Sequence, residues 1–147
     1  MKISEKYTDI DVEFDLIAAK NGIDNKAPRN VLSRATDLAE NILEPMALKF
    51  DFRILSWYRS SVLEREYCKK SYFEWLRTNR LTVTEQNWIK YLQEKQHITG
   101  SAVSILSNDL QAVYEWLQTQ TFDILQLRDG YIHVSYVKDT NRKLVLN

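Results

Sequence analysis

The dipeptide Asp129-Gly130 constrains the fold more than any other feature of the chain. On either side of it, residues 122–128 and 131–137 alternate apolar and polar side chains, as half-buried β-strands do. An Asp-Gly pair between two such runs is a strong signal for the tight turn of a β-hairpin. We therefore predict an antiparallel hairpin over residues 122–137, and a sheet that contains it.

Helical and extended patterns elsewhere complete the fold prediction. Apolar residues at steps of three and four predict helices over 28–50, 61–77 and 107–120, with a further helix running to about Lys95 after a capping box at Thr82 and Glu85. Pro45 predicts a kink or an early stop near Glu44, and Ser107 is the expected cap of the helix that follows it. The remaining expectations are an extended lead-in, a short helix over 15–20, a buried strand within 52–60 and a short edge strand over 143–146.

Together these elements predict an α+β fold. We expect a small antiparallel sheet packed against helices mainly on one face. The segment at about 61–95 reads as an inserted helical hairpin beside the sheet. Its aromatic and basic side chains could bind a protein partner or nucleic acid, although packing against the body of the domain is the more common role of such aromatics.

Composition limits the classes of function. The 147 residues suit one domain, and 20 basic and 20 acidic side chains give a formal net charge of zero, so we expect no nucleic-acid partner. The only cysteine, Cys68, excludes an internal disulfide. The charged start of the chain lacks the apolar core of a signal peptide, and no run is long enough to span a membrane, so we expect cytoplasmic synthesis.

The chain has only two histidines, His97 and His133. His133 lies in the second strand of the predicted hairpin, whereas His97 precedes Gly100 and a run of small residues that reads as a loop entering a strand. Both imidazoles could point into one cleft. The alternative to a shared functional site is that His97 in its loop and His133 in its strand have structural roles only, with their ring nitrogens hydrogen-bonded to neighbouring groups.

Five short motifs follow one another between residues 15 and 137, namely Gly22-Ile23-Asp24-Asn25, Leu43-Glu44-Pro45-Met46, Ser56-Trp57-Tyr58-Arg59-Ser60, His97-x-x-Gly100-x-Ala102-x-Ser104 and Tyr131-Ile132-His133-Val134-Ser135. In this order they resemble the motifs of the M15 zinc peptidases. This family includes D-Ala-D-Ala carboxypeptidases and phage endolysins and has a hedgehog-like fold. The resemblance implies a single M15 peptidase-like domain over 1–147.

The resemblance implies roles for particular residues. His97 and His133 match two zinc ligands of the family, while Ser104 stands where the third ligand, an aspartate, is expected. The family's general base is a carboxylate shortly before the second histidine, and Asp129 is the nearest carboxylate here. A serine hydroxyl supplies no charge to a zinc ion, so zinc binding is in question.

Substrate binding is implied for the segment that contains Arg59. Arg59 matches the arginine that holds a carboxylate or carbonyl of the substrate peptide, and Ser56 and Tyr58 accompany it as candidate substrate-binding residues. Trp57 replaces the glycine that is usual in the family. The alternative for Arg59 is a surface arginine paired with a nearby glutamate.

Two hypotheses follow for the function. The first is a non-catalytic M15 peptidase-like protein of the phage structural or interaction type, associated with a virion, that binds a protein partner or peptidoglycan. The second is an active zinc peptidase that cleaves peptidoglycan stem peptides, with Asp129 as base. The loss of the aspartate ligand and of the usual base favours the first.

Overall fold

The computed structural model describes residues 1–147 and has the predicted α+β architecture. Five strands form one sheet in the order β1-β2-β4-β3-β5. The strands are β1 (Arg53–Ser56), β2 (Ala102–Leu106), β3 (Ile124–Arg128), β4 (Tyr131–Ser135) and β5 (Leu144–Leu146). The first four pair antiparallel, as predicted, and β5 adds to the edge parallel to β3.

Helices occupy more of the chain than strands. They are α1 (Asp9–Glu13), α2 (Leu16–Asn21), α3 (Arg29–Leu38), the π-helical η1 (Ala39–Leu43), α4 (Glu44–Ala47), α5 (Ser61–Thr78), α6 (Glu85–Leu92) and α7 (Leu110–Gln118). None of them is both long and apolar enough to cross a bilayer.

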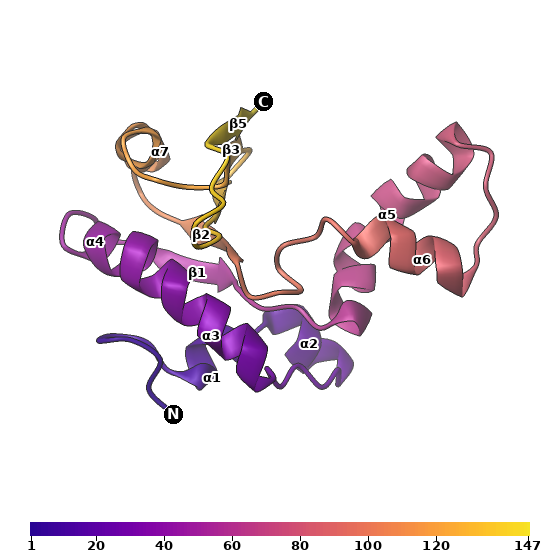
Figure 1. Ribbon diagram of the computed structural model, residues 1–147, viewed down its shortest axis with the longest axis horizontal. Coiled ribbons are helices and arrows are strands. Elements are labelled where there is room, and N and C mark those ends of the chain that lie inside the picture. The colour runs from indigo at the N-terminus through magenta and orange to yellow at the C-terminus, as the bar shows by residue number, and fades with distance from the viewer.

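The hydrophobic core lies on one face of the sheet. Val103 and Ile105 of β2 and Ile132 and Val134 of β4 point to this face, where they join apolar side chains of α3, η1 and α7 in one buried cluster. Figure 1 shows α3 and α7 on the same side of the strands. Because side chains alternate along a strand, the opposite face receives Ser104 and His133, and it is this face that carries the polar site.

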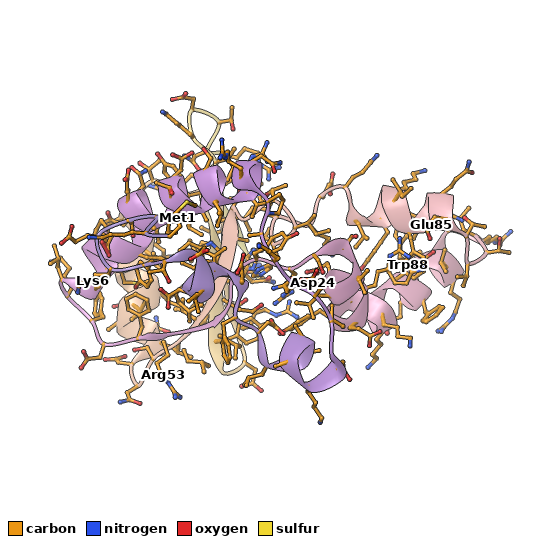
Figure 2. The ribbon with its side chains drawn as sticks, turned by 90° about the horizontal axis from the view of Figure 1, so that it is seen from below. Met1, Lys6, Asp24, Arg53, Glu85 and Trp88 are labelled. Atoms are coloured by element: carbon orange, nitrogen blue, oxygen red, sulfur yellow. The ribbon has the colours of Figure 1, made fainter.

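The inserted helices α5 and α6 form a hairpin that projects from the sheet (Figure 1). Tyr72 of α5 stacks on Trp88 of α6 with ring centroids 3.5 Å apart, and Tyr91 packs against Tyr72 and Trp75. Trp88 lies well out along this projection (Figure 2). For these aromatics the expectation of packing against the body is therefore wrong, since they form a small separate core between the two helices, whereas Tyr67 of α5 does contact the body.

The helix that contains Pro45 does not stop at Glu44. Glu44 N–H donates to the carbonyl of Ala39, five residues back, in the wide turn of η1. This insertion of one residue places Pro45 in the first turn of α4, where a missing N–H leaves no bond unmade. The helix thus continues to Ala47 through a local widening, and the expectation of an early stop is wrong.

Three details near helix starts also differ from expectation. Residues 9–13 are helical rather than extended, because the Asp11 carboxylate accepts the backbone N–H of Thr8 at 2.8 Å and caps α1. Thr84, not Thr82, caps α6 by accepting from Asn87 N–H. Asp109 caps α7, since the hydroxyl of Ser107 donates to the carbonyl of Asp51 instead.

Candidate functional site

A row of side chains crosses the face of the sheet opposite the core. Ser56 of β1 is paired with Ser104 of β2, Ser104 with His133 of β4, His133 with Gln126 of β3, and Gln126 with Leu146 of β5. Paired residues of neighbouring strands point to the same face, so the row is continuous across all five strands. Its last four members line a cavity of about 530 Å³, and the row forms the floor of that cavity.

The loop between α6 and β2 brings His97 over this floor. The Arg59 N–H donates to the His97 carbonyl at 3.0 Å, and the Trp57 indole N–H donates to the Gly100 carbonyl at 3.1 Å. Gly100 has φ of +81°, and a Cβ there would lie 2.8 Å from both the side chain and the carbonyl oxygen of Val31. Only glycine fits this position, because the loop passes directly against the start of α3.

The hydrogen bonds of His97 fix its tautomer. Nδ1 lies 2.6 Å from the carbonyl oxygen of Trp57, which can only accept, so Nδ1 carries the proton. Nε2 is then an acceptor, and the Ser104 hydroxyl donates to it over 3.4 Å. The rings of His97 and His133 lie 5.2 Å apart, edge to face. The structure thus brings together the two histidines and the serine that the sequence singled out.

Both imidazoles are held neutral. Burial, followed by the positive charge of Arg59, puts the pKa of His97 well below its usual value. Burial, followed by the charges of Arg59, Arg128 and Lys95, lowers the pKa of His133 to about 4. The site therefore presents uncharged ring nitrogens in a region of positive potential.

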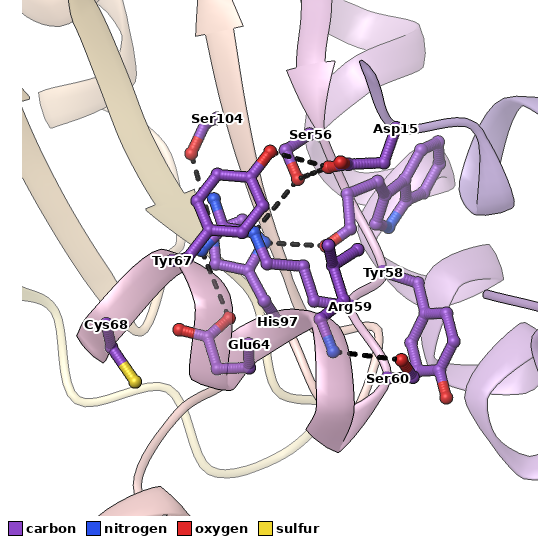
Figure 3. A network of polar contacts seen from close by, with 12 residues as sticks. Asp15, Ser56, Tyr58, Arg59, Ser60, Glu64, Tyr67, Cys68, His97 and Ser104 are labelled. Carbon is purple, nitrogen blue, oxygen red and sulfur yellow. Dashed lines mark hydrogen bonds and ion pairs between the residues drawn. The ribbon is translucent and has the colours of Figure 1, made fainter. Parts of the chain in front are cut away.

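Arg59 is held by its own neighbours (Figure 3). Its Nε donates to the Ser56 hydroxyl at 3.0 Å, its Nη1 pairs with Glu64 at 3.1 Å, and its guanidinium lies 3.6 Å from the centre of the Tyr67 ring. The pairing with a glutamate is the alternative raised from the sequence, but the pair is not on the surface: the two side chains are 11% and 5% exposed. Burial raises the pKa of Glu64, and the charge of Arg59 opposes that rise.

Asp15 accepts hydrogen bonds from two members of this network, Ser56 and Tyr67, and was not singled out from the sequence. One carboxylate oxygen accepts from the Ser56 hydroxyl at 2.8 Å and from the Tyr67 hydroxyl at 2.7 Å. The other accepts from the backbone N–H groups of Ile17 and Ala18 and so caps α2. Burial and this bond to Asp15 raise the pKa of Tyr67 to about 12, so the phenol stays protonated and keeps donating.

Three other residues named from the sequence lie outside the cavity. Tyr58 is buried, and its carbonyl accepts from the side-chain amide of Asn25. Asp129 is exposed in the turn between β3 and β4 and does not line the cavity. Ser56 is fully buried and contacts Arg59 rather than the open space.

The cavity lies between the sheet floor and the base of the helical hairpin. Its lining includes cationic, acidic, hydroxyl and apolar side chains, namely Leu55, Arg59, Glu64, Tyr67, Cys68, Ser71, Glu94, Lys95, Gln96, His97, Ser104, Ile124, Gln126, Arg128, Tyr131, His133 and Leu146. The sequence analysis did not single out Lys95, Gln126 and Arg128, because Lys95 lies far along the chain from the other two and none of them belongs to a motif.

The donor set does not fit a hydrolytic zinc centre. Such a centre takes three protein ligands, usually with a carboxylate or thiolate or as three imidazoles. Here the two imidazoles are accompanied by the hydroxyl of Ser104, which contacts His97, and no group of three or more histidine, cysteine, aspartate and glutamate side chains is placed to hold a metal ion. Of the two carboxylates that line the cavity, Glu64 is already paired with Arg59, and Glu94 belongs to no such group.

Comparison of the chain with protein-family models, with curated proteins and with solved structures found no match.

Proposed function

We propose that this protein is a non-catalytic M15 peptidase-like protein that binds a peptide, such as a peptidoglycan stem peptide, in the cavity between the sheet and the helical hairpin. The observation that carries the proposal is the contact between the Ser104 hydroxyl and His97 Nε2. In an M15 peptidase this ring nitrogen and an aspartate at position 104 would share the zinc ion. Here a neutral hydroxyl occupies that place, while the surrounding cavity is kept.

The walls of the cavity support binding of a peptide. Leu55, Ile124 and Leu146 offer apolar surface, and Ser104, Gln126 and His133 offer hydrogen-bonding groups along the floor. A few polar groups among apolar side chains are typical of ligand sites, because the apolar surface supplies affinity and the polar groups fix orientation. Virion association and a phage origin belong to the same proposal and rest on the resemblance alone.

One observation favours the alternative, an active zinc peptidase acting on peptidoglycan. His97 donates Nδ1–H to a backbone carbonyl and so presents an unprotonated Nε2 to the cavity, which is how metal-binding histidines are usually oriented. Under this alternative His97, His133 and a further ligand hold zinc, and Asp129 or another carboxylate serves as base.

The substitution Ser104→Asp separates the two functions. We expect the purified native protein to hold no stoichiometric zinc. It should sediment together with peptidoglycan but should not cleave it. Ser104→Asp restores the third ligand, so we expect it to bind about one zinc per chain and to be stabilised by zinc, whereas Ser104→Asp combined with His97→Ala binds none. Elemental analysis and thermal unfolding with and without zinc provide the measurements.

Stoichiometric zinc in the native protein, lost in His97→Ala and His133→Ala, would support the peptidase instead. If Ser104→Asp fails to bind zinc while remaining folded, the three positions do not have the geometry of a metal site, and the resemblance to M15 peptidases loses its main support.

A further inference from the structure

The cations around the cavity are not equivalent. Arg59 is bound on three sides by Ser56, Glu64 and Tyr67, with its charge matched by Glu64. Its positive charge is therefore already compensated, and a ligand carboxylate would gain less from it than from a cation without an acidic partner. Arg59 is therefore poorly suited to the role that the resemblance gives it.

Lys95 and Arg128 are the cations that remain available. Both line the cavity, Lys95 from the end of the helical hairpin and Arg128 from the end of β3, and neither forms an ion pair within 4 Å. The Lys95 ammonium lies 4.7 Å from the centre of the Tyr91 ring, a contact that leaves its hydrogen-bond donors free for another partner. Arg128 is exposed.

The acidic side chains of the lining cancel these two charges only in part. Glu64 is matched by Arg59, and Glu94 lies where the cavity meets a second pocket, which Arg142 also lines. Burial is the largest cause of the lowered pKa values of both histidines, followed by the charge of Arg59, and the charge of Lys95 adds to both while that of Arg128 adds to the shift of His133. An anionic group would find a favourable potential in the part of the cavity that Lys95 and Arg128 line.

We propose that Lys95 and Arg128, rather than Arg59, recognise the carboxylate of a peptide bound in this cavity. The inference rests on the proposed function and adds to it the ligand class and the residues that select it. The apolar side chains Ile124 and Leu146 lie on the same part of the lining as Arg128, on β3 and β5, and would contact the aliphatic part of such a peptide.

The test uses two forms of one probe that differ only in charge. N-acetyl-alanyl-D-alanyl-D-alanine carries a single carboxylate, and its C-terminal amide carries none. We expect the native protein at low ionic strength to bind the acid about tenfold more tightly than the amide, because charge-assisted hydrogen bonds are about twice as strong as neutral ones. NMR titration of isotope-labelled protein measures both affinities.

The variants Lys95→Gln and Arg128→Gln should each weaken binding of the acid severalfold and leave binding of the amide unchanged. The double variant should bind acid and amide alike. Lys90→Gln is the matched control, since Lys90 is exposed on α6 and does not line the cavity. We expect it to bind both forms as the native protein does, and unfolding midpoints establish that every variant is folded.

Two results would overturn the inference, and they differ in what they say about the proposed function. If the acid is preferred equally by the native protein and the double variant, another cation selects the carboxylate, and peptide binding in the cavity stands. If neither form binds at any accessible concentration, peptide binding fails together with the inference.

Discussion

At the scale of single residues, the loop that carries His97 depends on Gly100. Two features act at this position: the backbone has φ of +81°, and any Cβ would lie 2.8 Å from Val31. Gly130 shares the first feature, with φ of +88°, but has open space around it. The two glycines therefore separate the cost of an unusual backbone angle from the cost of close packing.

Gly100→Ala should destabilise the protein by about 3 kcal/mol, because it adds a clash with backbone to the penalty of roughly 1–2 kcal/mol for a left-handed conformation. Gly130→Ala is the control and should incur the conformational penalty alone. Denaturant unfolding of both variants gives the free energies. Equal losses would mean that the loop moves away from Val31 easily, and that Gly100 does not fix the position of His97.

At the scale of secondary-structure elements, the helical hairpin has its own small core. Tyr72 is fully buried between the helices although it lies outside the main hydrophobic cluster. Trp88 stacks on it, and the guanidinium of Arg65 lies 5.0 Å from the centre of the Trp88 ring. Elements that bury little surface against the rest of a protein open more easily than its core does.

Trp88→Ala should therefore unfold α6 locally and leave the sheet intact. The expected cost is about 3 kcal/mol, the usual range for removing a large aromatic from a packed site. Hydrogen exchange should accelerate over residues 61–95 and stay unchanged over β2 and β4. Ile89→Ala, at a position that is 56% exposed on the same helix, should have little effect. Acceleration throughout the chain would mean that hairpin and body unfold as one unit.

The sequence predicted those elements that depend on interactions between residues close together in the chain. The turn at Asp129-Gly130 and the limits of α5 were predicted because alternation, helical periodicity and turn residues are local signals. The π-helical turn before Pro45 was not, since it depends on which carbonyl Glu44 reaches. The meeting of His97, Ser104 and His133 was expected, whereas Asp15, Lys95 and Arg128 reach the site only through tertiary packing.

At the scale of the whole molecule, Asp15 connects three separate parts. Its four hydrogen bonds join the N-terminal segment, β1 and the helical hairpin. Asp15→Ala would leave two buried or half-buried hydroxyls, those of Ser56 and Tyr67, without this acceptor. A buried polar group without a partner costs about 1–3 kcal/mol.

We expect Asp15→Ala to lower the free energy of unfolding by about 3 kcal/mol or more, because it also removes the cap of α2. Exposed Asp24, whose carboxylate accepts only from Lys26 N–H nearby, provides the control variant Asp24→Ala, with a loss below about 1 kcal/mol. Chemical denaturation measures both, and hydrogen exchange should rise in α2 and in the first turns of α5 together. A rise confined to α2 would show that Asp15 is only a helix cap.

The cavity has two walls that are packed independently. The sheet belongs to the main core, and the hairpin has its own aromatic core. The contacts that connect the two walls are made by Asp15, by Arg59 and by a few hydrogen bonds to the His97 loop. Each wall of the cavity is therefore stabilised by its own apolar core, the sheet by the main cluster and the hairpin by its aromatic side chains. Substitutions within the hairpin could change the width of the opening without disturbing the sheet, so ligand selectivity could evolve while the fold keeps its stability.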